Sequence, residues 1–202
     1  MSALEFTHVS AAADSRGFHP VAKSSLAWRC REAGAAFEER DGWLVPVSVP
    51  GEAERLARVG VADISYLAKL ELRPAGDPVE GEGIVWYPIS PRRALVLCAP
   101  PLAARVREQA ADRFVLDVTG ALTVIAITGP EADTVLRRIT HLHRFPSGGE
   151  VAHVTAHVLE RAGGYWIVVA QELGEHMVDV VLDRAEALGG GLVGVDALGA
   201  AS

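Results

Sequence analysis

VGVADISYLAKLEL, residues 59–72, recurs in altered form as FVLDVTGALTVIAI, residues 114–127. In each copy an apolar stretch reaches an Asp, a β-branched residue and a hydroxyl residue, after which the apolar stretch resumes. This pattern is typical of a β-strand that is interrupted by a polar kink. At the kinks we expect the carboxylates of Asp63 and Asp117 to accept backbone N–H groups. The recurrence predicts a duplicated α+β unit.

The second copy opens a complete unit, whereas the first is shortened. Pro130 and nearby acidic residues predict a helix over residues 130–140. After the first copy, the Pro- and Gly-rich residues 73–83 cannot hold a helix. Other patterns predict helices over 23–33, 52–58, 101–111 and 172–188, a hairpin over 37–47, a turn over 146–149, and strands over 84–89, 94–98, 151–160, 165–170 and 192–195.

This order of elements is β-α-β-β-α-β with additional strands, as in ferredoxin-like folds. We therefore predict an α+β fold whose antiparallel-rich sheets carry helices on one face. Residues 1–20 are rich in Ala and Ser and predict a flexible arm. Residues 21–198 are predicted to form a single domain of two repeats, an eroded one over about 59–112 and a complete one over 113–198.

Composition argues against several classes of protein. A net charge of −7 and a pI near 5.5 leave no basic surface for nucleic acid. Charged residues interrupt every apolar run before about eighteen residues, so no membrane span is expected, and the N-terminus lacks a secretory signal. Two cysteines, Cys30 and Cys98, are too few for a disulfide framework, so we expect a cytoplasmic protein.

Clusters of arginine and histidine are the remaining polar patterns. Three arginine pairs are expected on solvated faces rather than at an anion site: Arg92-Arg93, Arg105 with Arg107, and Arg137-Arg138. Two histidine pairs have spacings that point each pair to one sheet face: His141 with His143, and His153 with His157. Because no Cys or carboxylate is fixed beside them, we expect no metal site. The sequence also lacks a Walker loop, a dinucleotide fingerprint and a Ser elbow.

Short motifs through most of the chain after Val21 resemble one superfamily. The N-terminal part is similar to the start of the glycine cleavage T-protein, a folate-dependent aminomethyltransferase, at Gly34-Ala35, Gly42-Trp43, Val45-Pro46, Glu52 and Val61-Ala62-Asp63-Ile64-Ser65. The C-terminal part resembles the gamma subunit of heterotetrameric sarcosine oxidase, a shorter member of the superfamily, at Thr128-Gly129-Pro130, Ala132, Leu142-His143, Phe145-Pro146, Gly148-Gly149 and the strand from Val151. The resemblance implies two intertwined β-α-β units that exchange their last strands, the fold of the T-protein N-terminal folate-binding region.

The resemblance also implies where the chemistry has changed. T-proteins carry a catalytic Asp in a strand that corresponds to Ile84–Ile89, which has no carboxylate here, so we expect no catalytic residue. The family's folate-reading Glu, after a turn, corresponds to Tyr165 or Trp166 in this chain. Its Ser-His-Met corresponds to Ser65-Tyr66-Leu67. Tyr66, Leu67, Tyr165 and Trp166 would then line an aromatic cleft for tetrahydrofolate, the one cofactor that the resemblance implies.

The function that we predict is a catalytically deficient T-protein-like subunit of a folate-linked, sarcosine oxidase-like complex that oxidises amines, with flavin-binding subunits as partners. T-proteins enclose folate between three domains, and the third would begin near Gly194–Leu198, so a partner would supply the missing wall. One alternative is a stand-alone aminomethyltransferase or folate-binding protein that rebuilt its site from Asp63, Asp117 or Glu160. Another alternative is a scaffold without a ligand.

The shortened first repeat predicts an interface. A missing helix would leave one sheet face uncovered, and residues 84–89 are large and apolar. We expect Trp86 and Tyr87 to contact either the helix over residues 23–33 or a partner subunit.

Overall fold

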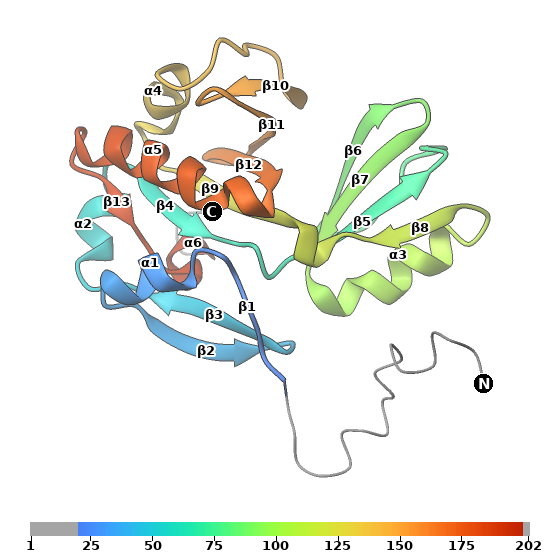
Figure 1. The fold of residues 1–202 in the computed structure, drawn as a ribbon, viewed down its shortest axis with the longest axis horizontal. Helices are drawn as coiled ribbons and strands as arrows, with labels where there is room; N and C mark the ends of the chain where they lie inside the picture. The colour runs from blue at the N-terminus through green and yellow to red at the C-terminus, as the bar shows by residue number, and fades with distance from the viewer. Residues whose placement is uncertain (1–19, 200–202) are drawn as a thin grey trace.

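Three β-sheets and six α-helices make up the part of the chain, residues 20–199, that the computed structural model describes (Figure 1). The flexible arm predicted for residues 1–20 lies outside the described residues except for Pro20. Antiparallel pairs dominate the sheets, and the prediction of an α+β fold is confirmed.

The largest sheet has six strands in the order β10-β11-β12-β9-β4-β13. Every neighbouring pair is antiparallel except β13 with β4, which is parallel. The strands are β4 (Gly60–Asp63), β9 (Leu122–Thr128), β10 (Ser147–Val151), β11 (Val154–Arg161), β12 (Gly164–Ala170) and β13 (Gly191–Leu192).

Two smaller sheets contain the other strands of residues 20–199. The four-stranded sheet has the order β6-β7-β5-β8 and is entirely antiparallel. Its strands are β5 (Ala68–Arg73), β6 (Ile84–Ser90), β7 (Arg93–Cys98) and β8 (Phe114–Asp117). The three-stranded sheet contains β1 (Ala22–Lys23), β3 (Trp43–Ser48) and β2 (Ala36–Arg40), in that order.

The helices are short except for one. They are α1 (Ala27–Glu32), α2 (Glu52–Leu56), α3 (Ala103–Gln109), α4 (Ala132–Arg137), α5 (Gly174–Glu186) and α6 (Val195–Gly199). Buried residues of α1, α4 and α5 belong to one apolar cluster with β9, β11 and β12, so these helices cover one face of the six-stranded sheet. The other face of that sheet packs against the four-stranded sheet in a second cluster. The prediction of helices on one face is therefore confirmed for the largest sheet.

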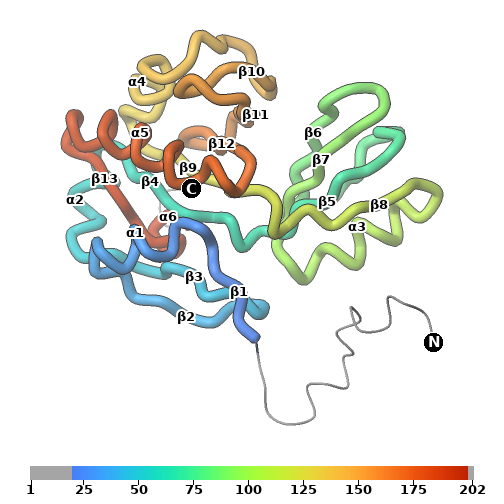
Figure 2. The backbone as a smooth tube through the Cα atoms, viewed as in Figure 1, coloured from blue at the N-terminus to red at the C-terminus, as the bar shows by residue number. Residues whose placement is uncertain are grey.

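The two copies of the recurrent phrase lie side by side and cross between sheets in opposite directions (Figure 2). The first copy runs from β4 in the six-stranded sheet to β5 in the four-stranded sheet, and the second runs from β8 to β9 in the reverse sense. Val61 pairs with Ile127 in one sheet, and Leu72 pairs with Val115 in the other. The duplicated, intertwined fold is thus confirmed.

Each crossing point is a polar kink of the predicted kind. Asp63 Oδ1 accepts the Ser65 N–H at 3.0 Å, and Asp117 Oδ1 accepts the Thr119 N–H at 3.0 Å. Because both carboxylates bind the N–H two residues further along the chain, both kinks are Asx turns. The structural role expected for the two aspartates is confirmed.

The hydroxyl residue of each kink binds the strand that follows the other kink. Ser65 Oγ accepts the Val124 N–H of β9 at 3.0 Å. Thr119 Oγ1 accepts the Lys69 N–H of β5 at 3.0 Å. These reciprocal bonds satisfy backbone groups that leave the sheet ladder where the chain changes sheets. Neither crossing can be completed without the other copy.

The turn predicted at residues 146–149 is wrong, because residues 147–151 form the edge strand β10. Its glycines permit a close approach that a side chain would block. A Cβ at Gly148 would lie 2.5 Å from His157 Nδ1, and a Cβ at Gly149 would lie 2.9 Å from Leu142 Cδ2. Gly therefore marks close backbone packing here, as it does in other strands.

The expectation of an uncovered sheet face is corrected by the structure. Residues 74–83 form no helix, as predicted, but α3 covers the four-stranded sheet instead. Val106 of α3 and Ala110, which directly follows the helix, pack with buried residues of β5 and β7. Helix α1 packs on the six-stranded sheet rather than on β6. Of the two contacts expected for Trp86 and Tyr87, α1 therefore does not supply the one with residues 23–33, and the one with a partner subunit stays a prediction.

We predict that Ser65→Ala lowers the free energy of unfolding by about 1–3 kcal/mol, because it leaves the buried Val124 N–H without a partner. Thr119→Val should cost less, because Thr119 is only half-buried. Thr155→Val, at an exposed position of β11, is the matched control and should stay within about 0.5 kcal/mol. Urea denaturation measures all three, and a Ser65→Ala protein as stable as the control would contradict the role of the crossing.

Candidate functional site

The four residues expected to line a folate cleft do not share one surface. Tyr66, Leu67 and Trp166 are partly buried against the second cluster, between the six-stranded and four-stranded sheets. Tyr165 is the neighbour of Trp166 on β12 and packs on the opposite face, against the first cluster. Successive residues of a strand point to opposite faces, so the two aromatic side chains pack on opposite faces of the sheet.

Tyr165 and Trp166 nevertheless meet at a shallow hollow of about 190 Å³ beside Leu198. The Arg161 guanidinium lies 4.9 Å from the centroid of the Trp166 ring, a cation–π distance. On the other face, the Tyr165 ring meets the Phe145 ring edge-on at 5.2 Å between centroids, and its hydroxyl donates to Asp133 Oδ1 at 3.3 Å. Tyr165 therefore has a packing role on the helix-bearing face.

Buried polar groups lie between the six-stranded and four-stranded sheets. We call this region the inter-sheet site and define it by Tyr66, Leu67, Lys69, Tyr87 and His157. Lys69 is fully buried and is one of only two lysines in the chain. Its Nζ donates to the Ser65 carbonyl oxygen at 2.5 Å and lies 5.8 Å from the centroid of the Trp43 ring. Burial lowers the pKa of Lys69 from 10.5 to about 8, although Asp63 and Asp117 act in the opposite direction.

Asp63 is the buried carboxyl group beside this lysine. It is 3% exposed, and burial raises its pKa above the ordinary value. Hydrogen bonds from Ser65 and Ser24, together with the charge of Lys69, act to lower the pKa. The carboxyl and the amine therefore each offset part of the cost of burying the other's charge.

Tyr87 links the two sheets at the same site. It is 4% exposed, and its hydroxyl shares a hydrogen bond of 3.0 Å with Nδ1 of His157 on β11. The two rings meet edge-on with centroids 5.2 Å apart. Burial, with a smaller effect of the Arg93 charge, lowers the pKa of His157. Burial therefore favours the neutral imidazole over the charged form next to the tyrosine.

Arg93 is fixed by a carboxylate of the neighbouring strand. The Glu71 side chain is only 8% exposed, and its Oε2 accepts from Arg93 at 2.7 Å. Arg73 binds the other oxygen of the same carboxylate. Glu71 thus holds two arginines at the edge of the inter-sheet site, because a buried carboxylate requires paired cations.

Trp86 lies on the face of β6 opposite to Tyr87. It packs on the third cluster beneath α3, and the Arg113 guanidinium lies 5.9 Å from the centroid of its ring. Of the two residues expected at an interface, Tyr87 is buried and bonded within the chain, whereas Trp86 is half-buried.

The sequence did not predict Lys69, Glu71 and His157 as site residues. Residues 68–72 alternate between apolar and charged side chains, which is the pattern of a strand with one solvated face. The structure instead buries that charged face between two sheets. One signal was available, since Lys69 is a rare lysine in a chain that otherwise uses arginine.

The carboxylates of the alternative site have separate partners. Asp63 binds the Ser65 N–H, whereas Asp117 binds Thr119 and the Arg107 guanidinium, and hydrogen bonds with both residues keep its pKa below the ordinary range. Glu160 is exposed on β11 opposite Tyr165. Within residues 20–199 no three His, Cys, Asp or Glu side chains gather as a metal site would require. No described helix is long and apolar enough to cross a membrane.

Comparisons with solved structures place this fold among known ones. The glycine cleavage system aminomethyltransferase T from Bartonella henselae superposes with a TM-score of 0.68 at 15% identity, covering 88% of this chain and 60% of that protein. A chain of heterotetrameric sarcosine oxidase from Corynebacterium sp. U-96 superposes with a TM-score of 0.55 at 17% identity, covering 67% of this chain and 91% of that one. No family model and no curated protein matches the sequence. The chain therefore has a T-protein-like fold.

We predict that Lys69→Met removes a pH-dependent part of the free energy of unfolding, because it removes a buried amine whose pKa is lowered by burial. The unfolded chain keeps the proton of this amine up to about pH 10.5 and the folded chain only up to about 8, so the contribution of Lys69 to stability should rise with pH across that window. The variant should lack this rise, whereas the exposed control Lys23→Met should keep it. Urea denaturation from pH 7 to 10.5 measures the difference in stability between wild type and each variant; a difference for Lys69→Met that stays constant across the window would contradict the assignment.

Acidification should weaken the fold through His157. Its pKa is lower in the folded state than in the unfolded chain, so the unfolded state takes up the proton first and stability falls as the pH drops below about 6.5. We predict a smaller loss in His157→Gln than in wild type. The control His153→Gln, at a side chain that is 93% exposed, should behave like wild type. Melting temperatures between pH 7 and 5 measure the difference, and equal acid sensitivity in all three proteins would contradict this prediction.

Proposed function

We propose that this protein is a catalytically deficient, T-protein-like subunit of a folate-linked complex that oxidises amines. The observation that carries the proposal is the composition of β6. T-proteins hold a catalytic Asp in the corresponding strand, whereas Ile84–Ser90 contains no carboxylate. Tyr87 occupies the inward position of that strand and is bonded to His157.

Loss of the acid should suppress the chemistry rather than the binding of a ligand. A general acid or base typically contributes about 10²–10⁴-fold to a rate. The Tyr87–His157 pair does not replace it, because it links the two sheets and the hydroxyl is buried. The apolar and aromatic side chains of Tyr66, Leu67 and Trp166 still suit a pteridine-like ring.

The proposal of partner subunits is supported by the assembly to which a similar protein belongs. The chain spans 60% of the T-protein that it resembles, and the sarcosine oxidase chain that it resembles comes from a heterotetramer. We propose that flavin-binding subunits carry out the oxidation and that one of them contacts the four-stranded sheet at Trp86. Tetrahydrofolate is the proposed ligand of the assembled complex.

A stand-alone aminomethyltransferase is the alternative within the same superfamily. It would need a free carboxylate near the ligand, and Asp63 and Asp117 are instead engaged in the kinks. Glu160 is exposed and has no such bond among the described residues, and it lies on the strand next to Trp166. A ligand-free scaffold is the other alternative, and only a binding measurement separates it from our proposal.

We predict saturable binding of tetrahydrofolate in calorimetry when the chain is combined with its flavin-binding partners. Trp166→Ala should weaken this binding about tenfold, which is the effect of losing one aromatic contact. Trp28→Ala is the matched control, because Trp28 is an exposed tryptophan on α1. The isolated chain should release no ammonia from an aminomethyl-lipoyl carrier.

Each outcome separates the hypotheses. Ammonia release by the chain alone would establish the aminomethyltransferase instead. If tetrahydrofolate binds neither the isolated chain nor the chain combined with its partners, the ligand-free scaffold is the remaining hypothesis. Equal effects of Trp166→Ala and Trp28→Ala would refute the proposed lining.

A further inference from the structure

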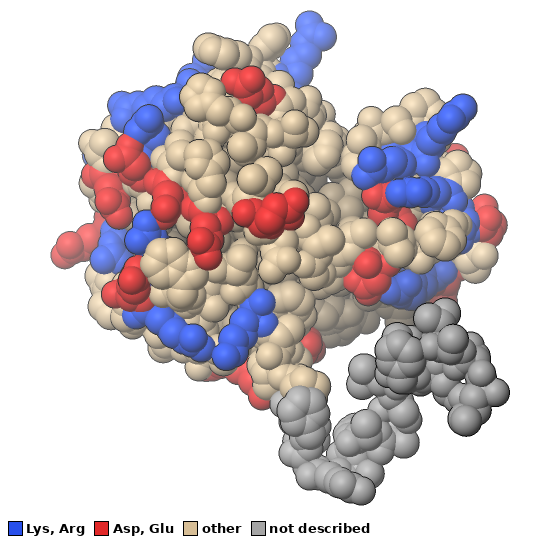
Figure 3. All heavy atoms as spheres, in the orientation of Figure 1, with Lys and Arg blue, Asp and Glu red and all other residues tan. Residues whose placement is uncertain are grey.

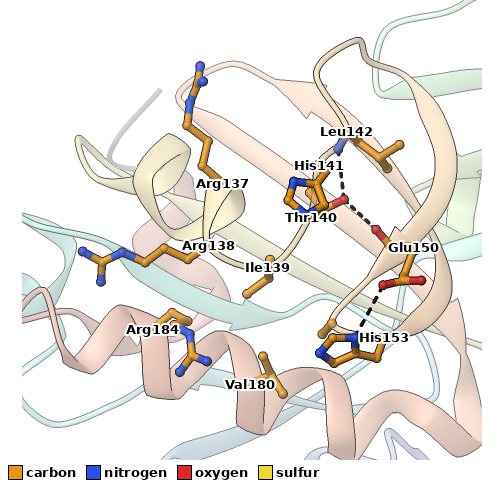
Figure 4. A pocket seen from close by; sticks show the side chains of 11 residues that line it. Arg137, Arg138, Ile139, Thr140, His141, Leu142, Glu150, His153, Val180 and Arg184 are labelled. Carbon is orange, nitrogen blue, oxygen red and sulfur yellow. Dashed lines mark hydrogen bonds and ion pairs between the residues drawn. The ribbon is translucent and has the colours of Figure 1, made fainter.

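A second cavity lies on the helix-bearing side of the six-stranded sheet, away from the inter-sheet site. Its volume is about 480 Å³, within the range of small-molecule sites. It is bounded by the C-terminal end of α4, the turn between β10 and β11, and α5 (Figure 4). The lining includes two arginines from the end of α4, one arginine from α5, two histidines and one carboxylate: Arg137, Arg138, Arg184, His141, His153 and Glu150.

The arginines differ in how they are held. Arg137 is paired with Asp133 at 2.6 Å, and Arg184 is paired with its neighbour Asp183. Arg138 contacts no carboxylate among the described residues and is exposed at the rim. Glu150, the single carboxylate of the lining, lies 3.5 Å from His153 Nδ1. The guanidinium of Arg138 therefore lies at the cavity without a carboxylate partner among the described residues.

Arg184 is the only basic residue of α5, whose other charged side chains are acidic. Figure 3 shows acidic side chains gathered over the region of α5 and α1 on the face that it displays. Asp179 binds Arg29 of α1, whereas Arg184 and Val180 line the cavity. Residues three and four apart share one side of a helix, so α5 presents its basic residue to the cavity and pairs Asp179 with α1.

The turn that closes the cavity is strained and firmly held. Ala152 and His153 have φ values of 49° and 66°, a region that favours glycine. The Ala152 N–H donates to the Ile139 carbonyl oxygen at 2.7 Å, and a ring nitrogen of His176 lies 2.9 Å from the Ala152 carbonyl oxygen. Strained turns that the surroundings fix in this way often occur at ligand sites.

We propose that this cavity binds a small organic anion with a carboxylate or phosphate head and an apolar body. The head would lie between Arg138 and Arg184, because a guanidinium presents a planar fork of donors to such oxygens. The body would lie on the apolar side chains of Ile139, Leu142 and Val180. Sequence patterns placed Arg137-Arg138 on a solvated face and treated the histidines separately; the fold brings them to one cavity.

Calorimetric titration of the full chain with phenyl phosphate and with benzoate tests the proposal. At least one probe should bind saturably with a dissociation constant of about 1 mM or lower. Arg138→Gln and Arg184→Gln should each weaken that binding about tenfold, because each removes a charge-assisted contact. Arg92→Gln is the matched control, because Arg92 is an exposed arginine in the turn between β6 and β7, outside the cavity.

The two probes also identify the head group. Preference for phenyl phosphate assigns a phosphate, and preference for benzoate assigns a carboxylate; either supports the site. Lack of saturable binding of both probes up to about 10 mM overturns the proposal. Binding that Arg138→Gln and Arg184→Gln leave unchanged, or that Arg92→Gln weakens equally, also overturns it. Circular dichroism of the variants, which change exposed or half-exposed side chains, verifies that they remain folded.

Discussion

The reciprocal hydrogen bonds at the two crossing points hold the rest of the structure in place. Ser65 binds the backbone of β9 and Thr119 binds the backbone of β5, so each kink secures the strand that continues from the other. Asp63 and Asp117 shape the kinks from within. Because the bonds are mutual, neither repeat can form its crossing alone, and the two sheets are held face to face.

Holding the sheets face to face creates the inter-sheet site and explains its polar contents. Lys69 and Glu71 lie on the side of β5 that a single sheet would expose to water, and they become buried here. Each then needs a partner, which Ser65 supplies to the lysine and two arginines supply to the carboxylate. A buried amine costs stability, and natural proteins tend to accept such costs where function requires them.

The strand pattern and the resemblance together predicted much of the fold, because kinked strands, hairpins and Pro- or Gly-rich turns have local causes. The hairpin at Asp41-Gly42 and the helix-free loop after β5 are examples. Contacts between residues far apart in the sequence were harder to predict. The pairing of Tyr87 with His157 joins residues 70 positions apart, and α3 covers the sheet face that the helix-free loop after β5 was expected to leave open. No local pattern encodes either contact.

The sequence by itself determined the duplicated phrase, the structural role of Asp63 and Asp117, and the absence of a carboxylate from β6. These features follow from residue type and short-range periodicity. Only the tertiary structure decided that Tyr165 and Trp166 face opposite sides and that Lys69 is buried. Only it gathered Arg138 and Arg184 around one cavity. The physical reason is that burial and proximity depend on which faces of distant elements meet, and a one-dimensional pattern does not specify that.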